Sequence, residues 1–292
     1  MTNPSSRPMT GKAVLITGGS GGIGKATALR LAQMGASVSI IGRDAGRTAT
    51  AAREIGTAGG TQTNAYTADL SSQAEVRRVA AEVLLALPRL DVLVNNVGGY
   101  WNTRHTTVDG LERTFAVNQL APFLLTSLLL ERLTASMPAR VVTVASNAQA
   151  LGRIDFDDLQ GEHRYSGARA YNQSKLANVL FTYELARRMS GKGVTANALH
   201  PGVVSTGFGA SDPGRSQRLI VPFARPFMRR ADQGAATSVL LAADPAVGAT
   251  TGAFFARGKP RKSSPRSHDQ AVARRLWQVC DELVNSPTSR HN

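Results

Sequence analysis

The sequence predicts an α/β fold of one domain, in which about seven parallel strands form a single sheet with helices on both faces. Two observations support this fold class. Short β-branched runs alternate with longer Ala- and Leu-rich stretches, and the first of these runs leads directly into a glycine-rich turn and a helical segment. Right-handed crossovers between parallel strands would then place helices on both faces of the sheet.

Each expected element follows from its local composition. The strands are the runs at 13–17, 37–41, 61–66, 90–95, 140–145, 193–199 and 252–255. The helices are the segments at 22–34, 44–56, 71–87, 108–135, 167–190 and 231–243. Asp44 and Ser71 stand at the starts of the second and third helices, where their side chains can accept from first-turn N–H groups, so both are expected N-caps.

The chain shows no internal repeat and no linker long enough to divide it, so one domain is expected over residues 11–256. Residues 1–10 are expected to form a disordered lead-in, and residues 257–292 a tail whose helix packs on the domain. Residues 205–230 combine Gly, Pro and Arg with large apolar side chains, and predict a flap that folds over a substrate site.

Composition sets the compartment and limits the chemistry. The chain has 292 residues, 42% hydrophobic and 18% charged, which suits a single large core. Its one cysteine, Cys280, excludes an intrachain disulfide and a thiolate cluster, so a reducing compartment such as the cytoplasm is expected. The histidines are scattered and predict no metal site. The Ala- and Arg-rich composition is typical of a bacterial source.

The net charge of +14 favours anionic partners. The charges are dispersed, however, and the densest patches, 215–230 and 257–266, lack the aromatic residues and module signatures of nucleic-acid binders. No nucleic-acid partner is therefore expected. The longest apolar run, 120–130, is shorter than the roughly 20 residues that span a bilayer, so no transmembrane segment is expected either.

The glycine-rich turn after the first strand predicts a dinucleotide site of the Rossmann type. Its glycines satisfy both TGxxxGxG and GxGxxG, and a strand precedes it and a helix follows it. Backbone N–H groups and the helix dipole can face a pyrophosphate there because side chains do not block the approach. The expected cofactor contacts in this turn are Gly18, Ser20, Gly21, Gly22, Ile23 and Gly24.

The end of the second strand bears on which dinucleotide binds. A carboxylate there usually holds a free adenosine ribose, whereas a 2′-phosphate needs a cation. Gly42 occupies the place expected for the acid, Arg43 follows it, and Lys25 can add charge. Asp44 also fits the NAD pattern by its spacing, although it reads as a helix N-cap. NADP(H) is favoured, and NAD(H) remains possible.

Several ordered landmarks give the chain a family resemblance. They are "TGGSGGIG" at 17–24, "ADL" at 68–70, "NNVGG" at 95–99, Asn118, Ser146, "YNQSK" at 171–175 and "HPGVVST" at 200–206. In these the chain resembles the short-chain dehydrogenases/reductases over nearly its whole length. Finer features, among them "GRD" at 42–44 and "DDLQ" at 157–160, resemble the retinol dehydrogenase and protochlorophyllide reductase branch.

The resemblance implies a catalytic set of four residues. Tyr171 would be the general acid and base that exchanges a proton with the substrate oxygen while the nicotinamide exchanges hydride with its carbon. Lys175 lies one helical turn away and would lower the pKa of the phenol and bind the nicotinamide ribose. Ser146 would hydrogen-bond the reacting oxygen. Asn118 would hold a water that links Lys175 to solvent.

The resemblance also implies further cofactor contacts. Asp69 would touch the adenine edge, with Leu70 packed nearby. Asn95, Val97 and Gly98 would lie close under the cofactor, with Val97 in place of the usual alanine. The remaining expected contacts, around the nicotinamide amide, are Pro201, Gly202, Val204 and Thr206. A second departure is Ala145, which stands where the family often has another serine.

The expected function is NADP(H)-dependent interconversion of a lipophilic aldehyde or ketone with its alcohol. Retinol dehydrogenases are commonly anchored by an N-terminal membrane segment that this sequence does not show, which argues against retinoid itself. A homodimer or homotetramer is expected, paired through the helix around 111–133 and the helix that carries Tyr171. Two alternatives stay open: a cofactor-binding sensor or scaffold without turnover, and a charge-driven binder of nucleic acid or membrane, to which the arginines of 215–230 would contribute.

Overall fold

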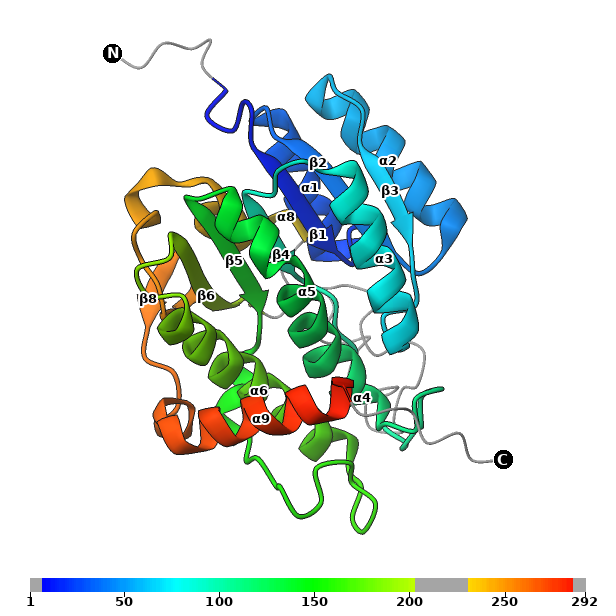
Figure 1. The fold of residues 1–292 in the computed structure, drawn as a ribbon, viewed down its shortest axis with the longest axis vertical. Coiled ribbons are helices and arrows are strands. Elements are labelled where there is room, and N and C mark those ends of the chain that lie inside the picture. Colours follow the sequence, from blue (N-terminus) through cyan, green and yellow to red (C-terminus); the bar gives the residue numbers. More distant parts are fainter. Residues whose placement is uncertain (1–6, 203–230, 286–292) are drawn as a thin grey trace.

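An eight-stranded sheet with the strand order β3-β2-β1-β4-β5-β6-β7-β8 runs through the protein (Figure 1). The structure is a computed structural model that describes residues 7–202 and 231–285. The first seven strands are parallel, and each matches a predicted strand to within a few residues. The strands are β1 Ala13–Thr17, β2 Ser37–Gly42, β3 Asn64–Thr67, β4 Val92–Asn95, β5 Ala139–Val144, β6 Val194–His200, β7 Phe254–Ala256 and β8 Lys259–Arg261.

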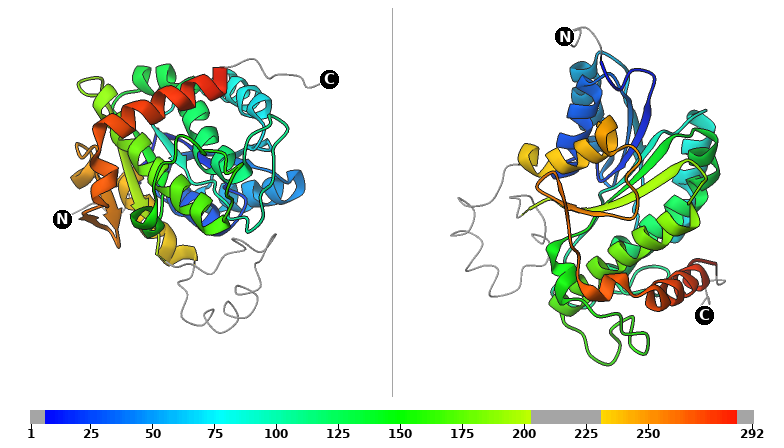
Figure 2. Two further views of the ribbon diagram at one scale, coloured as in Figure 1. Left: turned by 90° about the horizontal axis from the view of Figure 1, so that it is seen from below. Right: turned by 90° about the vertical axis from the view of Figure 1, so that its left-hand side faces the viewer.

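Helices cover both faces of the sheet, as predicted (Figure 2). One face packs against α1 Gly22–Gln33, α2 Ala45–Gly59 and α8 Ala231–Ala243. The other face packs against α3 Gln73–Ala86, α5 Ala121–Ala135 and α6 Gly167–Arg188. Each face has its own apolar core because the central strands are buried on both sides, which is typical of parallel sheets.

The eighth strand was not predicted from the sequence. It pairs antiparallel with β7 through a two-residue turn, in which Arg257 and Gly258 have φ values of 54° and 72°. Positive φ at both central residues is the geometry of a tight hairpin turn. A short, exposed Lys-Pro-Arg strand gives no alternating pattern, so only the turn geometry reveals it. The hairpin also crosses the domain boundary expected between residues 256 and 257.

Two local predictions need correction. The N-cap of α3 is Ser72 rather than Ser71, because the Ser72 hydroxyl accepts from the N–H of Glu75. Residues 7–10, expected in the disordered lead-in, pack on the domain: Met9 is buried, and its N–H donates to the carbonyl of Met34. Asp44 is confirmed as the N-cap of α2, where it accepts from the N–H of Arg47 at 2.8 Å.

The helix expected over 108–135 is interrupted. A single turn, α4 Arg113–Phe115, is followed by a π-helical turn, Ala116–Leu120, before α5 begins. Pro122 supplies a physical reason: it has no N–H to donate to the carbonyl of Asn118 four residues earlier, and its ring would clash with that carbonyl in an α-helix. Asn118 therefore lies in a widened turn, a feature that is frequent at functional sites.

The predicted C-terminal helix is α9, Gln270–Asn285, which lies across the outer surfaces of α5 and α6 (Figure 1). Trp277 stacks on Phe181 of α6 with ring centroids 5.8 Å apart and meets Phe123 of α5 edge-on at 5.0 Å. These are the two helices through which a homo-oligomer was expected to form. In this structure α9 covers that surface, so pairing through it would require α9 to move.

The stretch Arg113–Ala135 has the length and composition of a membrane-spanning helix, but 78% of its most apolar window is buried inside the protein. It serves here as a core element on which α3 and α9 pack. The predicted flap at 205–230, and with it Val204 and Thr206, lies outside the described residues.

Replacing Leu276 by alanine tests the packing of α9. Leu276 is 1% exposed, so its truncation should lower the free energy of unfolding by about 2–5 kcal/mol, the range for buried leucines. The matched control is Leu85→Ala in α3, which makes the same chemical change at a side chain that is 89% exposed and should cost less than about 0.5 kcal/mol. Urea unfolding measures both. Equal losses would contradict the position of α9.

Candidate active site

The predicted site residues gather at the carboxyl edge of the sheet. Thr17 ends β1, Asn95 ends β4 and His200 ends β6, and Ser146 lies two residues beyond β5. Open α/β sheets bind their ligands at this edge, where the strand order changes direction. The site therefore lies where the glycine turn and the start of α6 both contribute.

The glycine turn after β1 is tight and presents backbone rather than side chains. Gly18 and Gly22 have φ values of 67° and 52°, which favour glycine. A Cβ atom on Gly24 would lie 2.3 Å from the carbonyl oxygen of Gly18. Ser20 and Gly21 complete the turn, and α1 begins at Gly22, so Ile23 lies in its first turn. These residues fit a pyrophosphate held by N–H groups at a helix N-terminus.

Asn96 stabilises this turn, although it was not among the predicted residues. Its side-chain amide donates to the carbonyls of Thr17 at 2.9 Å and Gly18 at 3.4 Å. The Thr17 hydroxyl in return accepts from the backbone N–H groups of Asn96 and Val97. The side chain of Asn95 is buried instead, where it donates to the Thr126 hydroxyl of α5 at 2.9 Å.

A side chain at residue 42, at the end of β2, would require neighbouring hydroxyl groups to move. A Cβ atom on Gly42 would lie 2.2 Å from the Thr48 hydroxyl and 3.0 Å from the Ser20 hydroxyl. Arg43 follows it and is exposed, whereas Asp44 is engaged as the cap of α2.

A second arginine lies beside the glycine turn. One guanidinium nitrogen of Arg47 is 3.4 Å from the position of a Cβ atom built on Gly21. Lys25, which was expected to add charge there, forms an ion pair with Glu54 of α2. Arg47 is therefore the second cation at this end of the site. Arg47 was not predicted from the sequence, because its distance from the glycine turn depends on how α2 packs on the sheet.

The remaining predicted cofactor residues lie along the same edge. Asp69 follows β3, and its carboxylate accepts from the N–H of Ser71 at 3.0 Å, while Leu70 is buried in the core. Pro201 and Gly202 follow β6, and Gly202 has a φ of 92°. These positions border the volume between the sheet edge and the glycine turn.

Asn118 links the segment after β4 to α6. Its amide oxygen accepts from the N–H of Gly99 at 2.7 Å, and its amide nitrogen donates to the Gly99 carbonyl and to the Ser174 hydroxyl, both at 2.9 Å. Gly98 lies against it: a Cβ atom there would be 3.3 Å from Lys175 Nζ and 3.4 Å from Asn118 Oδ1. Three of the expected residues thus meet at one place.

Lys175 is almost completely enclosed, with 4% of its surface exposed. Its ammonium donates to the carbonyl of Val144 at 3.1 Å and to the amide oxygen of Asn178 at 3.2 Å. The same nitrogen lies 5.7 Å from the ring centroid of Tyr171. Burial lowers the pKa of Lys175 to about 8, because desolvation penalises the charged form.

The Ser146 hydroxyl lies close enough to the Tyr171 phenol to affect its protonation. Burial raises the pKa of the Tyr171 phenol, and the nearby Ser146 hydroxyl lowers it by less, so the net shift is upward. A lowered pKa was predicted from the neighbouring ammonium. The pKa is instead raised above the ordinary value of a tyrosine, because burial of the phenol outweighs the effect of the Ser146 hydroxyl.

The loop after β5 orients Ser146. Its hydroxyl accepts from the N–H of Ala148 at 3.2 Å, and the N–H of Asn147 donates to Nδ1 of His200 at 3.2 Å. His200 therefore supports the loop that carries the serine, a role that fits its expected place beside the Pro-Gly turn. Ala145, in place of the family's second serine, is buried and packs against Val179.

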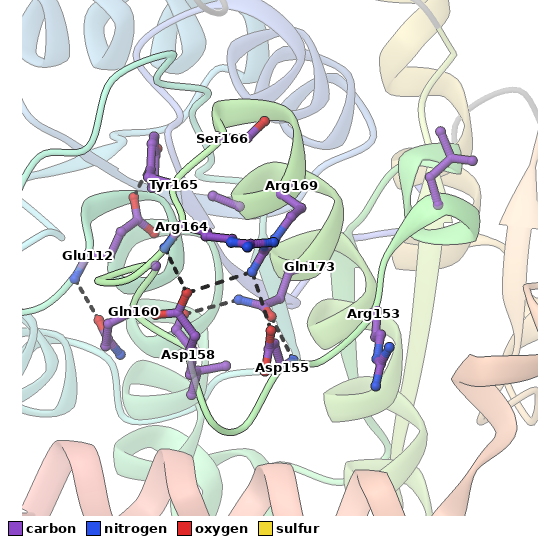
Figure 3. Close-up of a pocket in the computed structure, with 14 residues that line it drawn as sticks. Glu112, Arg153, Asp155, Asp158, Gln160, Arg164, Tyr165, Ser166, Arg169 and Gln173 are labelled. Atoms are coloured by element: carbon purple, nitrogen blue, oxygen red, sulfur yellow. Dashed lines mark hydrogen bonds and ion pairs between the residues drawn. The ribbon is translucent and has the colours of Figure 1, made fainter.

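A separate cavity of about 260 Å³ lies beside the start of α6, and Tyr171 is not among its lining residues (Figure 3). Its polar groups are largely satisfied by one another. Asp158 accepts from three backbone N–H groups, at residues 162–164, and pairs with Arg169 at 3.8 Å. Gln160 accepts from the N–H of Glu112 at 2.7 Å. The "DDLQ" segment at 157–160 thus holds the loop that leads into the catalytic helix.

Comparison with known proteins gives one family for most of the chain. Residues 12–215 match the family described as short chain dehydrogenase. Retinol dehydrogenase 12 of Mus musculus is 44% identical over 278 residues, which cover 94% of this chain and 86% of that protein. A Streptomyces protein provisionally named daunorubicin C-13 ketoreductase DnrU is 40% identical over 291 residues, which cover 97% of this chain and 98% of that protein.

Solved structures agree with this assignment. The Pseudomonas aeruginosa RhlG/NADP active-site complex superposes with a TM-score of 0.68 at 29% sequence identity, and the match covers 87% of this chain and 97% of that chain. The chain therefore belongs to the short-chain dehydrogenase family, in its retinol dehydrogenase-like branch, and is an oxidoreductase that acts on CH–OH or C=O groups with a nicotinamide dinucleotide.

Proposed function

We propose that the protein interconverts a lipophilic aldehyde or ketone and the corresponding alcohol with NADP(H), and that Tyr171 is its general acid and base. The observation that carries this proposal is the enclosed ammonium of Lys175, which lies 5.7 Å from the ring centroid of Tyr171, with the Ser146 hydroxyl near the same phenol. A phenol and a hydroxyl at the carboxyl edge of the sheet can hold one carbonyl oxygen between them.

Each residue has a defined part in this reaction. When bound, the dinucleotide supplies hydride to the substrate carbon or removes it. In reduction, Tyr171 gives its phenolic proton to the substrate oxygen, and Ser146 donates a hydrogen bond to the same oxygen as negative charge develops there. Lys175, when protonated, stabilises the phenolate that remains. Asn118 positions the segment after β4, at Gly98 and Gly99, beside this pair.

The preference for NADP(H) rests on the end of β2. Residue 42 is a glycine and offers no carboxylate for free ribose hydroxyls, and a side chain there would require the Thr48 hydroxyl to move. Arg43 is exposed in the next position and Arg47 approaches the glycine turn, so two guanidinium groups can pair with a 2′-phosphate. RhlG, a related structure by fold and sequence, is an NADP complex.

The substrate class follows from the relatives. The names retinol dehydrogenase and daunorubicin C-13 ketoreductase refer to the oxidation of an alcohol and the reduction of a ketone, and they support a carbonyl compound or alcohol, of the lipophilic class expected from the sequence, as the proposed substrate here. The complete set of Asn118, Ser146, Tyr171 and Lys175 favours turnover over a sensor that only binds cofactor.

We also propose a cytoplasmic location and a homodimer or homotetramer, built through a surface other than the one that α9 covers.

Replacing Tyr171 by phenylalanine tests the acid and base role. Turnover of lipophilic aldehydes and ketones with NADPH should fall by roughly 10²–10⁴-fold, the usual contribution of general acid–base catalysis, while NADPH binding stays within a few-fold. The control is Tyr183→Phe, which removes a hydroxyl on the same helix that hydrogen-bonds Ser263 instead. Equal activities of wild type and Tyr171→Phe would refute the role.

Replacing Arg43 or Arg47 by alanine tests the 2′-phosphate site. Each change should weaken NADPH binding about tenfold, which corresponds to ~1.4 kcal/mol, and leave NADH binding nearly unchanged. Fluorescence titration with both cofactors measures this, and Arg53→Ala, at an exposed arginine of the same helix, is the control. If the binding of NADPH and the binding of NADH weakened by the same factor, the arginines would not contact the 2′-phosphate.

Replacing Lys175 by methionine should remove a pH dependence of stability. The pKa of Lys175 is lowered to about 8, whereas an unfolded lysine titrates at about 10.4. Between these values the unfolded chain binds more protons, so the free energy of unfolding should rise by roughly 2 kcal/mol from about pH 8 to about pH 10. Above this window the raised pKa of Tyr171 acts in the opposite direction.

Urea unfolding across this window gives the slope for both proteins. The wild type should show the rise and Lys175→Met should show much less of it. Parallel curves would mean that Lys175 is hydrated in solution rather than enclosed.

A further inference from the structure

Asn178 contacts the catalytic lysine directly, although it was not among the predicted site residues. It lies one turn after Lys175 on α6 and is 1% exposed. Its amide oxygen accepts from Lys175 Nζ at 3.2 Å, and its amide nitrogen donates to the backbone carbonyl of Asn118 at 2.6 Å. The same nitrogen lies 3.2 Å from the side-chain oxygen of Gln119. Both polar atoms of Asn178 are thus used inside the active-site framework.

The π-helical turn makes the Asn118 carbonyl available for this contact. In a regular helix that carbonyl would accept from the N–H of residue 122, but residue 122 is a proline and has none. A buried carbonyl that loses its helical donor is costly unless another donor replaces it. Asn178 supplies that donor, so a side chain of α6 is bonded to the backbone that carries Asn118.

We propose that Asn178 is a positioning residue, which fixes the ammonium of Lys175 relative to Tyr171 by tying it to the Asn118 backbone. This inference rests on the proposed function, in which Lys175 and Tyr171 act as a pair. An ammonium has three N–H donors on a flexible stem of four carbons. Val144 and Asn178 take two of these donors, which leaves the third for the side where Gly98 borders the site.

The surroundings of Lys175 contain few other groups that titrate. On α6 the neighbouring titratable group is Tyr171. The π-helical turn contributes the neutral amides of Asn118 and Gln119, and β5 contributes the Val144 carbonyl. Behind Gln119 lies the thiol of Cys280 on α9, whose pKa burial raises to about 12. Among the described residues, therefore, the polar contacts that hold Lys175 are neutral.

The first test replaces Asn178 by leucine, which keeps the number and branching of the side-chain heavy atoms and removes both polar atoms. The matched control is Asn197→Leu: Asn197 is 5% exposed and makes two comparable hydrogen bonds, to the Thr250 carbonyl and from the Ala253 N–H, without touching Lys175. At saturating NADPH and substrate, kcat of Asn178→Leu should fall at least tenfold. Asn197→Leu should lower the melting temperature by a similar amount and keep kcat within threefold of the wild type. Parallel losses of kcat in the two variants would reduce Asn178 to a structural residue and overturn the proposal.

The second test replaces Asn178 by aspartate and does not depend on turnover. A carboxylate 3 Å from Nζ favours the charged lysine, so the rise of stability with pH in the alkaline range should begin at a higher pH than in the wild type. The aspartate variant can be measured even if Asn178→Leu fails to fold. An unchanged pH dependence would show that Asn178 does not contact Lys175 and would overturn the proposal. If the wild type reduced no substrate but Asn178→Asp still moved this dependence, the proposed function would fail while the positioning contact would stand.

Discussion

The enclosed ammonium of Lys175 is the constraint on which the site depends. A lysine removed from water needs acceptors for its donors, and their absence would cost several kcal/mol. β5 supplies one acceptor at Val144 and α6 supplies another at Asn178. Both acceptors must lie within hydrogen-bond distance of the ammonium for the buried lysine to be stable. Tyr171 lies one turn before this lysine on α6, so the requirement to satisfy one buried cation also positions the proposed proton donor.

A single proline connects this constraint to the rest of the fold. Pro122 interrupts the helix after β4 and leaves the Asn118 carbonyl without its usual donor, and the segment widens into a π-helical turn. The freed carbonyl is then bonded by Asn178, and the Asn118 side chain bonds Gly99. Local backbone chemistry in one helix thus determines how α6 approaches the loop that follows β4.

Local patterns were enough to predict the parallel strands, the glycine turn and the cap at Asp44, because each follows from residues close together in the sequence. The four residues proposed as catalytic were predicted from the order of landmarks along the chain, and the structure brings them together at one sheet edge. Contacts between distant segments were not predictable in this way. Asn96 supports the glycine turn from a different strand, and Arg47 reaches it only once α2 is placed. Strand β8 depends on a turn with positive φ at Arg257, which sequence composition does not reveal.

The position of α9 has a consequence for how the protein behaves on dilution. Phe123 of α5 and Phe181 of α6 are covered by Trp277 from the same chain, so burial of this apolar surface is an intramolecular event and does not depend on protein concentration. A subunit interface at the same place would dissociate as concentration falls. The chain therefore covers the outer surfaces of α5 and α6 at Phe123 and Phe181 by itself, and this part of the core stays closed however few copies of the protein are present.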